Sequence, residues 1–183
     1  KKIQLGDRIN AKGILQLHKL TMKGLLMTSK VGVFRPGPVY VVDQIKGKDI
    51  IRYTGPKNEK VPKLVGELLV WFNQQTSAKL HPLLVAGLLH YIFVSIHPFS
   101  DGNGRVTRLL TLWYMRFAGY GFRDAFIPDS YYTAHKFEYF TALDRAKTFP
   151  GRMQADITPF LEFFMHGLLN AAQNLQHDIM VPI

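Results

Sequence analysis

Residues 83–118, LLVAGLLHYIFVSIHPFSDGNGRVTRLLTLWYMRFA, place a short polar stretch between two apolar ones. The first apolar part belongs to Pro82–Ile96, which is apolar on nearly every side and predicts a buried helix. Pro98 bars that helix from continuing. Apolar spacing over Arg105–Ala118 predicts a second helix, which Gly119 ends. The polar stretch therefore lies where one buried helix ends and the next begins.

The glycines and arginines of HPFSDGNGRVTR suit a phosphate site. Gly102 and Gly104 flank Asn103 just before the helix, and glycines there let successive amide N–H groups point into one anion-binding nest. The N-terminus of the helix adds its own free N–H groups. Arg105 and Arg108 share one face of that helix. Cations in a first turn oppose the helix dipole, so a bound polyphosphate would explain them.

Asp101 and His97 add a metal ligand and a base. An acid beside an anion site can share Mg²⁺ with phosphate, because Mg²⁺ takes one or two carboxylates with phosphate oxygens and water. A neutral imidazole at His97 could take a proton from an attacking hydroxyl. Taken singly, each residue has an ordinary structural explanation, such as a turn or a solvated helix face. Gathered in twelve residues, they are the parts of a phosphoryl or nucleotidyl transferase.

The composition fits one domain and narrows the function classes. The chain has 183 residues, 47% of them hydrophobic and 13% aromatic, which is enough for one packed core over residues 1–183. The formal net charge of +10 favours polyanion partners, so a basic nucleic-acid-binding module is an alternative to an enzyme. The chain contains no cysteine, which excludes disulfides, thiolate catalysis and Cys-based zinc sites.

The apolar periodicity along the chain predicts an all-α fold of about six or more helices with one small β-hairpin. The predicted helices are Ile14–Leu26, Val61–Gln74, Pro82–Ile96, Arg105–Ala118, Ser130–Lys147 and Phe160–Leu175. Thr158 is the predicted N-cap of the last one. The hairpin, about residues 37–55, pairs Val39–Val42 with Ile50–Tyr53 around a Lys46–Lys48 turn.

The N-terminal residues, KKIQLGDRIN, contain neither a Met nor the apolar block of a signal peptide. We therefore expect a cytoplasmic protein of which this chain is a fragment. The longest apolar run, Leu83–Ile96, is too short to cross a bilayer, so no membrane association is expected. His90 lies on the same helical face as His97 and is expected to be buried and hydrogen-bonded. The scattered histidines, His18 among them, are expected to be structural or solvated.

HPFSDGNGRVTR resembles the Fic-family signature, His-x-Phe-x-Asp/Glu-Gly-Asn-Gly-Arg-x-x-Arg, at every defined position. The resemblance covers nearly the whole chain. ILQLHKLTM looks like the early helix of the family, GVFRPGPVYVV and PKLVGELLVWFNQ look like its flap region and the next helix, and IPDSYYTAHKFEYFTAL looks like its downstream element. The resemblance implies a Fic-type helical bundle with protein adenylyltransferase activity. Such enzymes move AMP from ATP to a Ser, Thr or Tyr hydroxyl of a target protein and release pyrophosphate.

The resemblance also implies roles for the residues of the signature. His97 would be the base that acts on the target hydroxyl, and Asp101 would hold Mg²⁺ on the α- and β-phosphates. The residues expected to hold phosphate are Gly102 and Gly104 through their amides, Asn103 at the α-phosphate, Arg105 at the β- and γ-phosphates and Arg108 at the γ end.

Two further regions receive roles from the resemblance. Tyr139 and Phe140 would lie against the adenine. The hairpin would be the flap that aligns the hydroxyl-bearing segment of the target by strand-like pairing. Its expected docking residues are Val42, Gln44, Ile45 and Lys46.

This sequence departs from the family pattern in places. Phe140 stands where a second Tyr is frequent, and Lys147 stands where a polar residue is frequent. The inhibitory motif Ser/Thr-x-x-x-Glu-Gly/Asn is absent, because Thr158–Glu162 has its first spacing but Phe163 follows. An upstream segment or a partner would then inhibit through Arg108. Phosphoryl or uridylyl transfer stays open beside AMP transfer, as does a homodimer, and nucleic acid is the less favoured partner.

Overall fold

The computed structural model describes residues 9–75, 80–120 and 129–180, which form eight α-helices and one two-stranded hairpin. The helices are α1 (Ala11–Met22), α2 (Val61–Gln75), α3 (Pro82–Ile96), α4 (Asn103–Met115), α5 (Asp129–Ala134), α6 (Lys136–Leu143), α7 (Phe149–Gln154) and α8 (Thr158–Met180). The strands are β1 (Tyr40–Ile45) and β2 (Lys48–Thr54). The predicted class, a helical bundle with a small hairpin, is confirmed.

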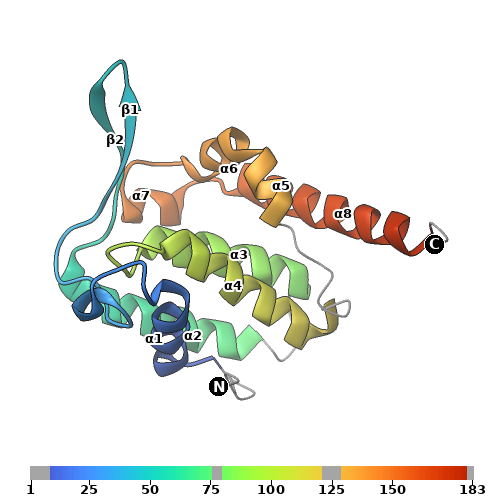
Figure 1. The fold of residues 1–183 in the computed structure, drawn as a ribbon, viewed down its shortest axis with the longest axis horizontal. Coiled ribbons are helices and arrows are strands. Elements are labelled where there is room, and N and C mark those ends of the chain that lie inside the picture. Colours follow the sequence, from blue (N-terminus) through green and yellow to red (C-terminus); the bar gives the residue numbers. More distant parts are fainter. Residues whose placement is uncertain (1–8, 76–79, 121–128, 181–183) are drawn as a thin grey trace.

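Helix α3 occupies the centre of the bundle (Figure 1). Helix α4 packs along it, α1 and α2 lie on one side, and α7 and α8 lie on the other. Most side chains of α3 are buried, as its apolar sequence predicts, and burial of apolar surface is the main force that stabilises such a core. The central position of α3 fixes the place of the residue at its C-terminal end.

The hairpin stands away from the helical body in Figure 1. Lys46 and Gly47 have φ angles of 49° and 74°, so both residues of the turn are left-handed, as in the two-residue turns that suit hairpins. The register between β1 and β2 shifts between Val41 and Val42, which marks a bulge. The predicted hairpin and its turn are confirmed.

The base of the hairpin is attached to the bundle. Tyr53 of β2 is fully buried, and its hydroxyl donates to the carbonyl of Ser95 in α3. The N–H of Thr54 donates to the carbonyl of Lys147 at 2.8 Å. The hairpin therefore has a fixed base, while side chains further along it, such as Val42, are exposed.

The aromatic region 129–154 differs most from its prediction. The single helix expected over Ser130–Lys147 is divided at His135, whose φ and ψ of −110° and 42° are not helical, and it ends at Leu143. The division lets α5 and α6 pack on α8 separately. The sequence does not predict α7, because Pro150 and Gly151 within it are typical of turns.

The start of α8 also corrects a prediction. Thr158 is the first residue of the helix and not its N-cap. Asp156 caps this end, since its Oδ1 accepts the N–H of Thr158 at 2.9 Å. A carboxylate suits the positive end of a helix, and the hydrogen bonds from Thr158 lower the pKa of Asp156.

No helix within residues 9–75, 80–120 and 129–180 has both the length and the apolar character needed to cross a membrane.

Candidate active site

His97 is the residue at which α3 ends. Its φ of 52° and ψ of 59° lie in the left-handed region, which side chains other than glycine rarely adopt. Its Nδ1 lies 3.1 Å from the carbonyl oxygen of Val94. Because a carbonyl oxygen only accepts, Nδ1 carries the proton and the lone pair of the neutral ring is on Nε2. The ring is therefore in the tautomer that can take a proton at Nε2.

The surroundings of His97 keep its imidazole neutral. Burial has the largest effect and lowers the pKa of His97 to about 4. The cations Arg35 and Arg152 also lower this pKa, whereas the hydrogen bond to Val94 and the carboxylate of Asp101 raise it. At neutral pH the ring is almost entirely unprotonated, as a general base requires.

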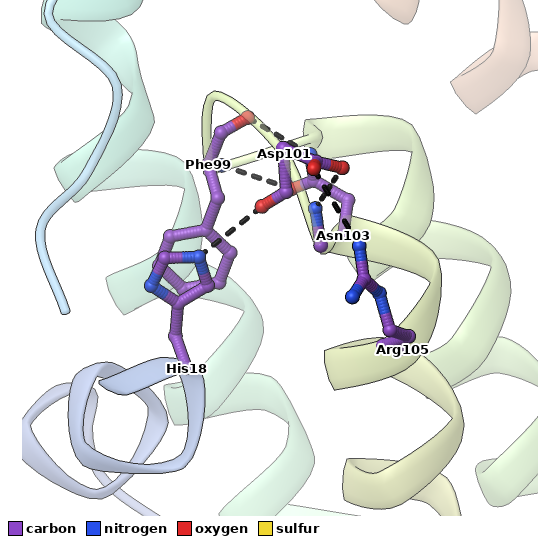
Figure 2. A network of polar contacts seen from close by, with 6 residues as sticks. His18, Phe99, Asp101, Asn103 and Arg105 are labelled. Atoms are coloured by element: carbon purple, nitrogen blue, oxygen red, sulfur yellow. Dashed lines mark hydrogen bonds and ion pairs between the residues drawn. The ribbon is translucent and has the colours of Figure 1, made fainter. Parts of the chain in front are cut away.

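Asn103 closes the loop between α3 and α4. Its Oδ1 accepts the N–H of Phe99 and its Nδ2 donates to the carbonyl of Phe99, both at 2.8 Å. The side chain is buried, and it lies next to Asp101 in Figure 2. The expected contact of Asn103 with the α-phosphate stays a prediction, while in this structure its amide shapes the loop.

Gly102 is the N-cap of α4, with φ of 80° and ψ of 4°. A Cβ atom at this position would lie 2.5 Å from Sδ of Met22 in α1, so the loop packs against α1 with no room for a side chain. Both the conformation and the packing require glycine here.

His18 of α1 supports the same loop (Figure 2). Its Nε2 donates to the carbonyl of Asp101 at 3.1 Å, and its Nδ1 accepts the N–H of Gly32 at 2.8 Å. The imidazole stacks on Phe99 with ring centroids 3.9 Å apart. His18 is fully buried, and burial lowers its pKa. The expectation of a structural histidine is confirmed, but its contact with the loop could not be predicted from its place on the apolar face of α1.

The carboxylate of Asp101 holds two groups that were predicted to bind phosphate. Its Oδ1 accepts the N–H of Gly102 at 2.5 Å, and its Oδ2 lies 3.5 Å from Nη2 of Arg105. The side chains of Asp101 and Arg105 are 57% and 41% exposed, so an anion can reach both. Arg108 follows three residues later on α4 and is partly exposed. An anionic group thus already lies at the N-terminus of α4, where a phosphate is predicted.

The site suits a metal ion that arrives with phosphate. Within the three described ranges, no cluster of three or more His, Asp or Glu side chains could hold a metal ion alone. Mg²⁺ needs only one or two carboxylates when phosphate oxygens and water complete its shell, so the exposed Asp101 fits this ion.

The comparison with known families decides the classification. The Fic/DOC family model matches residues 8–115, a range that includes α1, the hairpin, α2, α3 and α4. This chain belongs to the Fic/DOC family. The signature from His97 to Arg108 lies inside the matched range, and the implied helical bundle is the fold observed.

Comparisons with individual proteins also find Fic proteins. The chain is 32% identical over 161 residues to the protein adenylyltransferase Fic of Culex quinquefasciatus and 34% identical over 155 residues to that of Drosophila willistoni. These matches cover 88% and 85% of this chain but only 28% and 27% of the relatives. A solved Fic family protein from Desulfovibrio desulfuricans G20 has a TM-score of 0.74 and 29% identity, over 94% of this chain and 49% of that one.

The two residues of this Fic chain that were predicted to contact adenine, Tyr139 and Phe140, differ in exposure. Tyr139 is 6% exposed, and its hydroxyl lies 2.9 Å from Nε2 of the fully buried His90, so the prediction for His90 is confirmed. Thr111 lies 3.4 Å from Nδ1 of His90 and donates its own proton to the carbonyl of Thr107. His90 therefore donates from Nδ1 and accepts from Tyr139. Phe140, by contrast, is 48% exposed.

Replacement of Tyr139 by phenylalanine is expected to lower the free energy of unfolding by about 1 to 3 kcal/mol, because Nε2 of His90 would be left without its donor in the core. Urea unfolding would measure the change. Tyr40→Phe is the control, because Tyr40 is 50% exposed on β1, and it should change stability by less than about 0.5 kcal/mol. Equal losses in both variants would refute the buried hydrogen bond.

The flap residues lie on the exposed part of the hairpin. Val42, Gln44 and Lys46 are all exposed. The side chain of Ile45 lies outside the described part of the structure. Their role in docking a target stays a prediction. Lys147 contacts the base of this hairpin, because its carbonyl accepts the N–H of Thr54.

Two arginines buried beside the site were not predicted from the sequence. They are Arg35 and Arg152, which are 4% and 6% exposed. The guanidinium of Arg152 lies 3.7 Å from the ring centroid of Tyr53, and its Nη1 lies 3.4 Å from Oγ of Ser95. Arg35 could have been noticed as the one charge in the apolar, Gly- and Pro-rich segment VGVFRPGPVYVV. Arg152 offers no such sign, because it lies in a helix that the sequence does not predict.

Proposed function

We propose that this Fic domain transfers AMP from ATP to a Ser, Thr or Tyr hydroxyl of a target protein. The observation that carries the proposal is the pairing of a neutral His97, with its lone pair on Nε2, and the N-terminus of α4 across one closed loop. The names of relatives 32% and 34% identical, protein adenylyltransferase Fic, favour AMP as the group transferred.

The proposed step needs two events at the α-phosphorus. The target hydroxyl attacks it and gives its proton to Nε2 of His97, and the bond to the bridging oxygen breaks as pyrophosphate leaves. The N-terminus of α4 and Arg105 stabilise the charge on the phosphates. Asp101 would hold Mg²⁺, which when bound offsets phosphate charge. To bind Mg²⁺, the carboxylate would give up its contacts with the N–H of Gly102 and with Nη2 of Arg105.

Adenine binding is proposed to use the exposed ring of Phe140. Tyr139 packs beside it, with ring centroids 5.4 Å apart, and is held from the core side by His90. An aromatic face of this kind stacks on a purine without a hydrogen bond. The absence of a second Tyr hydroxyl at Phe140 is then no obstacle to nucleotide binding.

Target docking is proposed to use the hairpin. Each strand of a two-stranded hairpin has an open edge that can pair with an extended segment. Because the base of the hairpin is attached to α3, a segment on that edge would be presented near His97. Inhibition is proposed to act at Arg108, through a segment or partner that brings an acid to the γ-phosphate position.

Labelled nucleotides test the proposed chemistry. The domain is incubated with Mg²⁺ and a cell lysate, with ATP labelled at the α- or the γ-phosphate, or with α-labelled UTP. AMP transfer predicts that the domain adds label to protein, above that of the lysate alone, from α-labelled ATP only. Label above the same background from γ-labelled ATP would instead establish phosphoryl transfer, and such label from UTP would establish uridylyl transfer. Salt-sensitive binding of nucleic acid with no label in any arm would favour the binding module.

A further inference from the structure

Arg35 connects the turn at His97 and Pro98 to the segments that precede and follow the hairpin. It lies in the segment before β1 and is 4% exposed. Its Nε donates to the carbonyl of His97 at 2.8 Å, its Nη1 to the carbonyl of Gly37 at 2.6 Å, and its Nη2 to the carbonyl of Pro56 at 2.5 Å. Gly37 precedes the hairpin and Pro56 follows it, so one planar group joins three separate segments.

The backbone of Arg35 holds the same turn. Its N–H donates to the carbonyl of Pro98 at 2.9 Å, next to the His97 carbonyl that its side chain binds. His97 is in the left-handed region, which costs a non-glycine residue free energy unless surrounding contacts hold it there. Two adjacent carbonyls bound by one residue provide such contacts, and they fix the direction in which the imidazole points.

Only an arginine can make this connection. Its guanidinium presents several N–H donors in a rigid planar fork, whereas the ammonium of lysine is one compact group at the end of a flexible chain and cannot reach three separate carbonyls in this way. The group is bonded to backbone carbonyls, so the connection does not depend on the side chains of the three segments.

We propose that Arg35 is a positioning residue that couples the flap to His97, so that a docked target segment and the base keep one relative geometry. The inference rests on the proposed function. The charged groups facing His97 are Arg35, Arg152 and Asp101. The first two disfavour a protonated imidazole, which supports the same role for Arg35.

Two variants test the coupling from opposite sides. Arg35→Lys keeps the charge but loses the fork. Gly55→Ala leaves Arg35 and His97 intact, but its Cβ would lie 2.6 Å from Cγ1 of Val39 and 3.2 Å from Nη2 of Arg35, so it displaces the contact from the flap side. Arg145→Lys is the control, because Nε of Arg145 also donates to a backbone carbonyl, that of Asp156 at 3.0 Å, in an exposed position.

Transfer from α-labelled ATP and binding of a fluorescent ATP analogue with Mg²⁺ are measured for each protein. Both test variants should lose about 10- to 100-fold in transfer, the loss expected when reacting groups are misplaced, and bind the analogue within about twofold of wild type. The double variant should lose little more than the worse single one, because both changes break one connection. Wild-type transfer in a folded Gly55→Ala protein, or parallel losses of transfer and analogue binding, would overturn the coupling.

Hydrogen exchange separates this inference from the proposed function. If wild type labels no protein, the proposed function fails and the coupling is judged from exchange alone. Gly55→Ala should then lower the protection of amides in β2 and in residues 97–102 together, with residues of α2 unaffected. Unchanged protection in residues 97–102 would overturn the coupling.

Discussion

His97→Ala is expected to reduce transfer of label from α-labelled ATP by about 10²- to 10⁴-fold, the usual contribution of a general base. ATP binding should stay close to that of wild type, because the side chain of His97 bonds to Val94 and to none of the predicted phosphate ligands. Transfer assays and a dissociation constant for ATP with Mg²⁺ measure the two effects. Full transfer by the variant would show that another group takes the proton.

The control for this substitution is His166→Ala. His166 is exposed on α8 and belongs to none of the elements predicted to hold substrate, so its removal should leave transfer unchanged. A loss of transfer in both variants would point to a general effect of removing a histidine rather than to proton transfer at His97.

The pH dependence of transfer follows from the same residue. The pKa of His97 is about 4, so its neutral fraction, and with it transfer, should be constant from pH 8 to about pH 6 and fall as the pH approaches 4. Stability should fall earlier. The unfolded chain protonates this histidine near pH 6.5 and the folded chain does not until about pH 4, so stability is lost as pH falls through that window. Transfer that declines below pH 7 in step with an ordinary histidine would refute the lowered pKa.

The sequence predicted the elements whose pattern is local. Helix α3 matches its predicted bounds, since a continuous apolar run, Pro82 at its start and Pro98 after its end all lie in one stretch. The hairpin turn at Lys46–Gly47 is likewise a local signal. The division of the aromatic helix at His135 was not predictable, because it depends on packing against α8, which is distant in sequence.

The site divides in the same way. The spacing of residues in HPFSDGNGRVTR identified the base, the loop and the start of α4. The supports of that loop come from α1 and from the segment before β1, and His18 and Arg35 reach it only after the chain has folded. A single sequence carries little sign of such contacts, because a buried histidine or arginine bonded to backbone carbonyls needs no partner side chain with a recognisable spacing.

Gly102→Ala is expected to lower the free energy of unfolding by about 2 to 4 kcal/mol, the sum of a left-handed conformation forced on alanine and of overpacking in a filled site. Gly102 has φ of 80°, and the new Cβ would lie 2.5 Å from Sδ of Met22 and 2.9 Å from its Cγ. Relief requires Met22, which is fully buried in α1, or the loop itself to move. Urea unfolding of the two proteins at neutral pH gives the difference.

The neighbouring glycine provides the matched control. Gly104 lies in the first turn of α4, and a Cβ there would meet only Nη1 of Arg108, at 3.4 Å. Gly104→Ala should leave stability unchanged or raise it by up to about 1 kcal/mol, since alanine is favoured over glycine within a helix. Two glycines of one motif, two positions apart, should therefore respond differently to the same substitution. Equal losses would contradict the open, helical position assigned to Gly104, whereas a tolerated Gly102→Ala would mean that α1 does not press on the loop as described.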